Sequence, residues 1–578
     1  MFIRPCYKRK NGKKHAYWAL VESYRTERGP RQRIASYLGH IKESERLGVE
    51  RAAKGNRTSA FRQLQLFDSS RQPEPQWVEI DTAGVRVEKE LEFGGPWLAL
   101  QLIKALQLDS LFEDLIPRGR EDIPWSKMAL VLIICRLCKP SSELYIAEHY
   151  YGKTALPDLL GIPANKVYDQ RLYRSLDQLL PHKEALEQHL KERLGRLFDL
   201  KYDLLLYDVT STYFEGQCPG NPMAQRGYSR DRRPDCKQVC IGLVVSRGGM
   251  PLGYEVFEGN RNDVQTWRHT VTTMESRYGK ADRIWCGDRG MMSRENLAFM
   301  QAEGRHYIIS ASKASLKRFE KFLLQTDWQR IRDGLEVKLC RSPDGDQEMF
   351  ILCRSRDRKD KEKAMHQRFE QRIDAALEKL RAGCAKRPTR RQTIDRKVGR
   401  IMAKNSRAAG LYEVSVQQTD QGATVTWSKN ESWRRWAALS EGCYLLRSNV
   451  TQWSAEDLWH AYIQLTEAEA AFRIHKSDLR LRPIWHQKQD RVLAHIFVCF
   501  LSYVLWKTLY QMTRSAGLGD EPRRVFDELA TISLVDVILP TRQGVDIRRR
   551  CVRKPTEHQA ILLARLGLTM PSQLQNET

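Results

Sequence analysis

The spacing of hydrophobic and polar residues changes character twice along the chain. Residues 95–200 carry apolar side chains at the 3.6-residue period of amphipathic helices, and prolines separate the segments. From residue 201 the pattern changes to short apolar runs bounded by glycine and small polar residues, which is typical of strands. Helical spacing returns after residue 451. The pattern therefore predicts a helical region followed by a mixed α/β region.

The clearest strand is the apolar run at residues 204–211, LLLYDVTS, which predicts a central strand covered on both faces. Burying an unpaired carboxylate is costly, so Asp208 is expected to meet a metal, a cation or a hydrogen-bond network. The alternative, an Asp that caps the following turn, fits this stretch equally well.

The residues after Asp208 extend this strand into a sheet. Val239–Ser246 and Leu252–Phe257 predict two more strands around a turn at Gly248-Gly249, and Asp263 is expected to cap a helix over residues 266–278. A strand then leads to Gly287-Asp288, followed by a helix over 293–303 and a strand over 307–310. Three meandering strands followed by alternating helices and strands predict a mixed sheet of ribonuclease-H-like type.

Residues 312–450 interrupt that pattern with five predicted strands and a charged helix over 359–380. We interpret them as an inserted, strand-rich subdomain. Residues 381–407 are strongly basic, and such a run is either a solvated face or a phosphate-binding surface. Its candidate DNA-binding residues are Arg387, Arg390, Arg391, Arg396 and Lys397.

The two ends of the chain carry weaker patterns. Residues 16–24 and 31–37 predict a small basic hairpin, followed by a charged helix over 42–66 and a linker over 69–76. Residues 78–92 suggest a strand pair bent at Gly84, and residues 513–578 a mixed tail.

Composition narrows the class of protein. The chain has 578 residues, which is too long for one core. It carries 96 Lys and Arg against 71 Asp and Glu, a net charge of +25, and such an excess favours a polyanionic partner, most often nucleic acid. The 13 cysteines lack the spacing of a disulfide framework or a zinc site and suit a reducing cytoplasm.

No segment predicts a membrane span or a signal peptide. The longest apolar run, residues 492–506, is shorter than the roughly 20 residues that span a bilayer, and we predict a core helix there. His475, His486 and His495 lie in different segments, and we interpret them as core or surface residues rather than metal ligands.

Three carboxylates are the candidate catalytic groups: Asp208 at a buried strand, Asp288 after a strand and a glycine, and Glu469 on a predicted helix over residues 454–476. Hydrolysis or transfer of polymer phosphates commonly uses two divalent ions. Mg²⁺ prefers oxygen ligands, which three carboxylates supply.

The sequence around these carboxylates resembles the DDE transposases of bacterial insertion sequences, in particular the branch with a strand-rich insertion before the Glu. The matching segments are residues 207–212, YDVTST, and residues 287–290, GDRG. The third is that branch's Tyr-x2-Arg-x3-Glu-x6-Lys signature, matched at Tyr462, Glu469 and Lys476, with Leu465 in place of the Arg.

This resemblance implies cleavage at the ends of the protein's own element and strand transfer into target DNA. Asp208, Asp288 and Glu469 would hold two Mg²⁺ ions, with Mn²⁺ as a substitute. Tyr462 and Lys476 would contact DNA, and Arg473 would replace the Arg missing at Leu465. A homodimer acting on DNA in the cytoplasm, associated with the nucleoid, is implied as well. The alternatives are a ribonuclease-H-like nuclease without strand transfer and a non-catalytic DNA-binding protein descended from a transposase.

Two acids on the predicted helix compete for the catalytic role. Residues two apart lie about 200° apart around a helix, so only one of Glu467 and Glu469 faces the aspartates. Glu469 shares a face with Tyr462 and Lys476 at seven-residue spacing. We therefore assign Glu469 to the site and interpret Glu467 as a solvent-facing helix former.

These patterns divide the chain into six parts. The predicted parts are a basic hairpin and linker (1–94), a helical domain that either binds DNA or is a plain bundle (95–200), the first part of the catalytic core (201–311), the insertion (312–450), the second part of the core with the Glu helix (451–512) and the tail (513–578).

Overall fold

The computed structural model describes residues 2–10, 13–26, 29–39, 78–280, 282–345, 348–419 and 422–574. The helix predicted over 42–66 and the linker over 69–76 lie outside the described residues.

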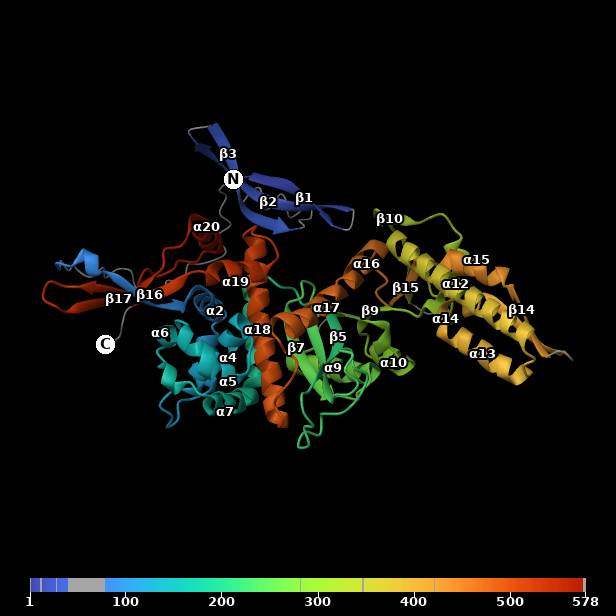
Figure 1. Ribbon diagram of the computed structural model, residues 1–578, viewed down its shortest axis with the longest axis horizontal. Helices are drawn as coiled ribbons and strands as arrows, with labels where there is room; N and C mark the ends of the chain where they lie inside the picture. Colours follow the sequence, from blue (N-terminus) through green and yellow to red (C-terminus); the bar gives the residue numbers. More distant parts are fainter. Residues whose placement is uncertain are drawn as a thin grey trace.

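A nine-stranded mixed sheet forms the centre of the molecule (Figure 1). Its strand order is β10-β11-β12-β15-β9-β8-β5-β6-β7. The predicted strands are all present, as β5 (Leu204–Tyr213), β6 (Gln238–Ser246), β7 (Pro251–Glu258), β8 (Ile284–Gly287) and β9 (His306–Ser310). β5 pairs antiparallel with β6 and parallel with β8, so it lies inside the sheet as its apolar sequence predicts.

Most strands of the predicted insertion extend this same sheet. They are β10 (Gln329–Arg332), β11 (Leu335–Arg341), β12 (Met349–Ser355) and β15 (Cys443–Ser448), and β15 pairs with β9. The interpretation of 312–450 as a strand-rich subdomain is therefore wrong for these four strands. Local spacing identifies a strand, but its neighbour in the sheet is set by contacts remote in sequence.

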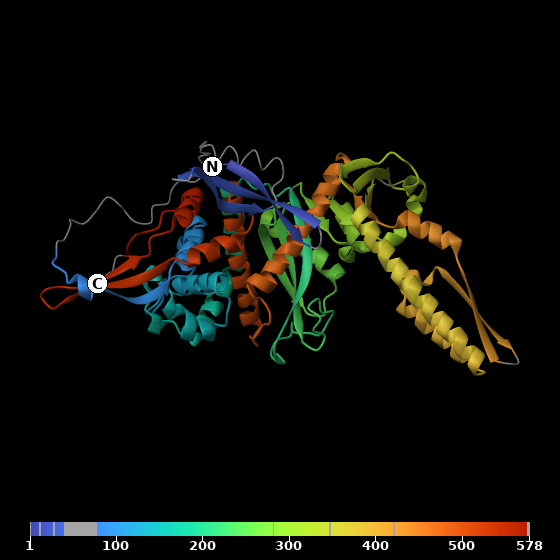
Figure 2. The ribbon, with the colours of Figure 1, turned by 45° about the horizontal axis from the view of Figure 1, so that its top comes forward.

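An arm projects from the sheet between β12 and β15 (Figure 2). It contains the helices α12 (Arg356–Lys386) and α13 (Arg391–Lys404) and the hairpin of β13 (Tyr412–Thr419) and β14 (Gly422–Lys429). Two small apolar clusters, around Ile373 and Ile394, hold the hairpin against the helices. The helix α15 (Glu431–Ser440) leads back to β15.

The two faces of β5 pack against different layers. Leu205, Tyr207 and Val209 contact the helices α9 (Asp263–Tyr278) and α10 (Arg294–Ala302). Leu204 and Leu206 belong to the main core on the other face. Because side chains alternate along a strand, Asp208 lies on the same face as Leu204 and Leu206. The cap of α9 is Asn262 and not Asp263 as predicted, since the Asn262 side chain accepts from the Val264 amide.

The predicted helical region is present, and it shares a core with the sheet. Its longer helices are α2 (Gly94–Ala105), α3 (Leu108–Leu115), α4 (Trp125–Cys138), α7 (Asp169–Leu179) and α8 (Lys183–Phe198). The apolar helix α18 (Gln489–Ser515) packs against α4 and α7 on one side and β7 on the other. By length and composition α18 is the one helix among the described residues that suits a membrane span, and it is almost wholly buried in this protein. The predicted core helix is therefore confirmed.

The ends of the chain form two small sheets. Strands β1 (Phe2–Lys10), β2 (Lys13–Thr26) and β3 (Gly29–Gly39) make an antiparallel sheet, so the predicted hairpin has a third strand. Residues 78–92 form one strand, β4 (Arg86–Glu92), instead of a pair.

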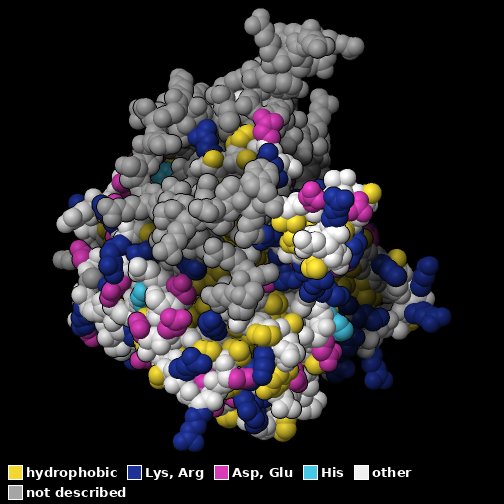
Figure 3. Space-filling view, turned by 90° about the vertical axis from the view of Figure 1, so that its left-hand side faces the viewer, with side chains coloured by type: hydrophobic (Ala, Val, Ile, Leu, Met, Phe, Trp, Pro, Cys, Tyr) yellow, Lys and Arg dark blue, Asp and Glu magenta, His cyan; other side chains and the backbone are white. Residues whose placement is uncertain are grey.

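β4 pairs with β16 (Ser533–Pro540), which pairs with β17 (Asp546–Val552). Helices α19 (Pro522–Ala530) and α20 (Glu557–Leu566) complete the tail. Figure 3 views the molecule from this end, where acidic and basic side chains are interspersed. The face is not uniformly basic.

Gly287 shows how tightly the layer under α9 is packed. A Cβ at this position would lie 2.4 Å from the Trp267 ring. Gly287→Ala is therefore expected to lower the melting temperature of the protein, because overpacking a core costs about 1–3 kcal/mol. Gly399→Ala on α13 is the control: a Cβ there meets no atom within 4 Å, and a helical Ala is expected to leave the melting temperature unchanged or raise it. Equal effects of the two substitutions would contradict this account of the packing.

Candidate active site

Asp208 and Asp288 lie side by side on neighbouring strands. β5 and β8 run parallel, and their register pairs Tyr207 with Gly287. The two aspartates directly follow these paired residues. Cys286 packs into the main core, and Asp288 lies two positions further along, so both aspartates are placed on the face of the sheet opposite α9.

Backbone and side-chain donors orient both carboxylates. Asp208 Oδ1 accepts from the Val209 amide at 2.8 Å. Asp288 Oδ1 accepts from the Arg289 amide at 2.6 Å and from Ser310 Oγ, at the end of β9, at 3.3 Å. Asp208 is therefore held within β5, and Asp288 is held where β8 and β9 end.

Glu469 approaches from a helix on the same face. The predicted helix over 454–476 is three segments: α16 (Ala455–Ile463), α17 (Leu465–Arg473) and the π-helix η8 (Ile474–Asp478). Ser454 caps α16 as the sequence suggests. α17 packs on β5 and β6, with Ala468 buried against the core and Glu469 exposed.

The three acids form one electrostatic cluster. Burial, together with the negative charges of Glu469 and Asp288, raises the pKa of Asp208 to about 6. The hydrogen bond from the Val209 amide and the positive charge of Arg230 lower the same pKa but do not offset this increase. Among the described residues, neither Asp288 nor Glu469 forms an ion pair. Carboxylates crowded together without a neutralising partner suit divalent cations with oxygen ligands, so the donor set fits the predicted Mg²⁺.

Tyr462 lies at the edge of this cluster. Burial raises the pKa of its hydroxyl to about 12, the hydroxyl hydrogen-bonds with Ser310, and the charge of Asp288 also acts on it. The structure therefore brings Tyr462 to the carboxylates, as the spacing predicts.

Lys476 is directed elsewhere. Its Nζ lies 2.8 Å from Asp231 Oδ1, and the Lys476 side chain is 10% exposed. Arg482 pairs with the same oxygen. The predicted continuous face from Tyr462 to Lys476 is therefore wrong, because the helix is interrupted after Ile463 and widens to a π-helix at Ile474.

Leu465, at the Arg position of the signature, and Arg473, its expected replacement, lie on different sides of α17. Leu465 is buried in the main core. Arg473 is exposed, one turn beyond Glu469.

The sequence analysis missed two charged residues beside the site. Arg230 acts electrostatically on both Asp208 and Lys476, and its Nη2 pairs with Asp263 Oδ2 at 2.5 Å. Asp231 is buried and holds Lys476. Both come from the polar loop between β5 and β6. The dense charge of residues 230–233, RDRR, is the sequence feature from which they could have been identified.

Glu467 does not face solvent freely, contrary to our prediction. Its Oε2 lies 3.5 Å from Lys507 Nζ of α18, and the Lys507 side chain is 5% exposed. Glu467 lies on the side of α17 that contacts Lys507, and the assignment of Glu469 to the site stays a prediction.

Comparison with known proteins identifies the family. A family model described as "Transposase DDE domain" matches residues 199–505. A second, described as "IS1634 family transposase, N-terminal domain", matches residues 3–65. The chain belongs to the DDE transposases of bacterial insertion sequences.

The remaining comparisons add little to this assignment. A solved structure of piggyBac transposase in a synaptic complex with hairpin DNA is 8% identical, with 79% of this chain and 82% of that chain covered and a TM-score of 0.34. The comparison with curated proteins gives no match.

The five basic residues named from the sequence lie on the arm of the transposase. Arg387 and Arg390 are between α12 and α13, and the other three are on α13. All five side chains are exposed. The arm therefore presents them to solvent.

The histidines behave as core residues. His475 and His495 are buried. Glu143, His486 and His495 place ligand atoms within 4.8 Å of one another. However, Arg136 Nη2 lies 3.5 Å from His495 Nδ1, His495 Nε2 lies 3.2 Å from the Leu481 carbonyl, and His486 Nε2 lies 3.3 Å from Glu143. A dication beside the buried Arg136 would add uncompensated charge, so we interpret the group as a hydrogen-bond network.

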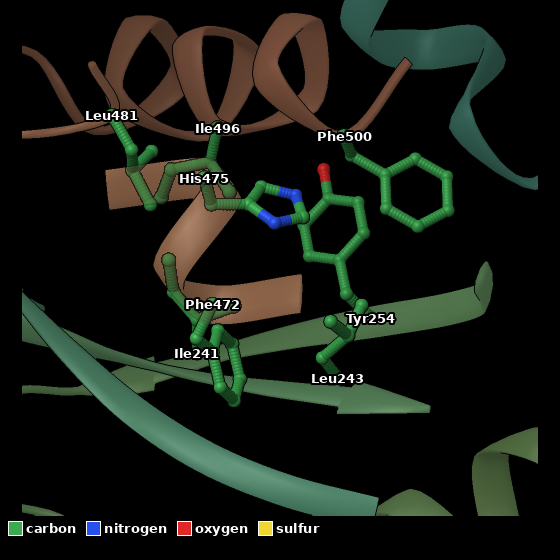
Figure 4. Close-up of a pocket in the computed structure, with 8 residues that line it drawn as sticks. All are labelled: Ile241, Leu243, Tyr254, Phe472, His475, Leu481, Ile496 and Phe500. Carbon is green, nitrogen blue, oxygen red and sulfur yellow. The ribbon is translucent and has the colours of Figure 1, made fainter. Parts of the chain in front are cut away.

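A small apolar cavity lies behind α17 (Figure 4). It is about 10 Å³ in volume, and Phe472 and His475 line it together with residues of β6, β7 and α18. A space of this size has room for about one water, and its lining is apolar, so it is a packing gap and not a substrate site.

The raised pKa of Asp208 predicts a pH effect on the metal-free transposase. An acid whose pKa rises from 3.8 to about 6 on folding binds more protons when folded, so its contribution to stability is lost as pH increases from about 4 to 6. Asp208→Asn removes this titration. The quantity to measure is the melting temperature of wild type minus that of Asp208→Asn, in the presence of a chelator. This difference is expected to decrease as the pH is raised from 4 to 6. A constant difference would contradict the assigned environment of Asp208.

Proposed function

We propose that this transposase cleaves DNA at the ends of its element and joins them to target DNA through two Mg²⁺ ions held by Asp208, Asp288 and Glu469. The observation that supports it most directly is the convergence of three carboxylates, two of them without an ion-pair partner among the described residues, on one face of the sheet. The family match over residues 199–505 supports the same reaction class.

We also propose that the central strands form a ribonuclease-H-like core. The order β7-β6-β5-β8-β9 supports this, since three antiparallel strands are followed by two parallel ones. In this arrangement β5, the first strand, and β8, its parallel neighbour, lie next to each other at the centre of the five strands. Asp208 and Asp288 come from those two strands.

The residues around the carboxylates have separable roles. The Val209 amide and the Arg289 amide with Ser310 hold Asp208 and Asp288 in fixed orientations. When bound, the two ions activate the attacking oxygen and stabilise the leaving oxygen of the phosphate. Tyr462 and Arg230 lie beside the acids and would orient the phosphate by hydrogen bonding and charge.

DNA contacts are proposed for two parts of the molecule. Arg473 follows Glu469 on α17, and Lys476 lies on η8. Lys476 would contact a phosphate only by leaving Asp231 or by sharing it. Arg387, Arg390, Arg391, Arg396 and Lys397 would contact DNA beyond the cleavage site. A homodimer on DNA, acting at the nucleoid, would bring two active sites to the two ends of the element.

Removing one negative charge from the site is expected to stop the chemistry and spare DNA binding. Asp208→Asn, Asp288→Asn and Glu469→Gln keep the side-chain shape but weaken divalent-ion binding. Cleavage of a duplex that carries the element end, taken from the DNA flanking the gene, should fall below detection in Mg²⁺, while gel-shift affinity stays near wild type.

The control is Asp203→Asn, at an exposed acid just before β5 that pairs with Arg247. It should cleave as wild type does. Near-normal cleavage by any of the three active-site variants would refute the assignment of that residue. Offering a pre-cut end separates a transposase, which joins it to target DNA, from a nuclease or a DNA-binding relative, which do not.

DNA affinity is expected to depend steeply on salt, because binding to phosphates releases counterions. Neutralising the five arm residues together should flatten the slope of log affinity against log salt by about 0.9 for each phosphate that the variant no longer neutralises. Arg86 and Arg542 are the control, since each already pairs with an acid, Asp546 and Glu79. An unchanged slope in the five-residue variant would show that the arm is only a solvated face.

A further inference from the structure

The helix that carries Glu469 is short and irregular at both ends. α17 spans Leu465–Arg473, Gln464 separates it from α16, and the π-helix η8 follows directly. A nine-residue segment between two irregular turns has little rotational restraint from its own backbone. Its rotation must therefore be set by side-chain contacts.

The apolar contacts of α17 are uneven along its length. Leu465 and Phe472 are buried near its ends, and the two buried residues between them, Ala468 and Ala471, are small. Phe472 lies beside the small cavity behind the helix (Figure 4). Dispersion contacts are non-directional, and a gap in them leaves room for small adjustments.

A directional contact exists on the side of α17 away from the aspartates. Glu467 reaches Lys507 of α18, with 3.5 Å between Oε2 and Nζ. Lys507 Nζ also lies 3.8 Å from the centre of the Tyr510 ring. A lysine buried to this extent requires a negative partner, so the contact is not an exchangeable surface pair.

The turn between β6 and β7 closes around this pair. Gly249 has φ of 75°, and a Cβ there would lie 2.6 Å from Glu467 Oε2 and 3.0 Å from Lys507 Nζ. Tyr503 Oη donates to the Gly249 carbonyl at 2.9 Å, and the Tyr503 ring lies 4.5 Å from that of His475. The pair therefore joins α17, α18 and the strands next to β5.

We propose that the Glu467–Lys507 pair sets the rotation of α17 and thereby aims Glu469 at Asp208 and Asp288. Glu467 and Glu469 lie about 200° apart on the helix, so fixing one side chain fixes the direction of the other. Glu467 is then a positioning residue that does not contact metal or DNA. This inference rests on the proposed role of Glu469 as a metal ligand.

Three full-length variants test it: Glu467→Gln, Lys507→Met and the double variant. Glu467→Gln leaves Lys507 buried without its partner, so both the melting temperature and the cleavage rate should fall. The Mn²⁺ concentration for half-saturation should rise about tenfold or more, as is usual when a residue that orients a metal ligand is removed. Mn²⁺ binding to the protein alone is followed by the electron paramagnetic resonance signal of the free ion.

The double variant separates positioning from stability. Removing both charges should restore most of the melting temperature, because no buried charge remains unpaired. Mn²⁺ binding and cleavage should stay impaired, because the directional contact is absent. Recovery of all three properties would show a purely structural role and overturn the proposal, as would unchanged Mn²⁺ binding in Glu467→Gln.

Two controls keep this result independent of the proposed function. Glu456→Gln alters an exposed acid on α16 and should leave Mn²⁺ binding unchanged. Glu469→Gln should abolish tight Mn²⁺ binding. If it does not, the assignment of Glu469 fails. If Glu469→Gln abolishes binding while Glu467→Gln keeps it, the positioning role alone fails.

Discussion

Asp208 lies in a strand whose neighbouring residues are almost all buried, and two further carboxylates approach it. Burial of Asp208, together with the negative charges of Glu469 and Asp288, raises its pKa to about 6, so its charged form is disfavoured without cations. The surrounding structure is organised to maintain this arrangement. Two parallel strands hold the aspartates at adjacent positions, and a helix from a distant part of the chain brings the third acid over the same face.

That helix depends on the layer behind it. α17 packs on the sheet, the π-helix η8 that follows it contacts α18, and α18 in turn packs on the helices of residues 95–200. The helical region is thus a support for the catalytic core, because its apolar residues continue the core that contains Leu204 and Leu206. The Glu467–Lys507 pair links α18 to the segment that carries Glu469.

Positive charge is distributed in two ways around this site. Close to the carboxylates, Arg230 and Lys476 are held by Asp263 and Asp231, so their positions are fixed. On the arm, the five basic side chains are exposed and face outward. Fixed cations beside the acids suit the positioning of a phosphate, and exposed cations on an extended arm suit contacts along a DNA duplex.

The sequence by itself indicated most strands of the central sheet, three candidate carboxylates and the family. The apolar run of β5 and the glycine before Asp288 are local features, and spacing on the helix favours Glu469 over Glu467 as the candidate. Other features were decided only by tertiary structure. The break at Gln464, the partner of Lys476 and the burial of Lys507 against Glu467 depend on which segments pack together. The same holds for β11, β12 and β15, whose patterns predict strands, while the sheet that accepts them is set by pairing between residues far apart in the chain. β10 has no counterpart among the predicted strands. Periodicity records which side of an element is buried, but not against what.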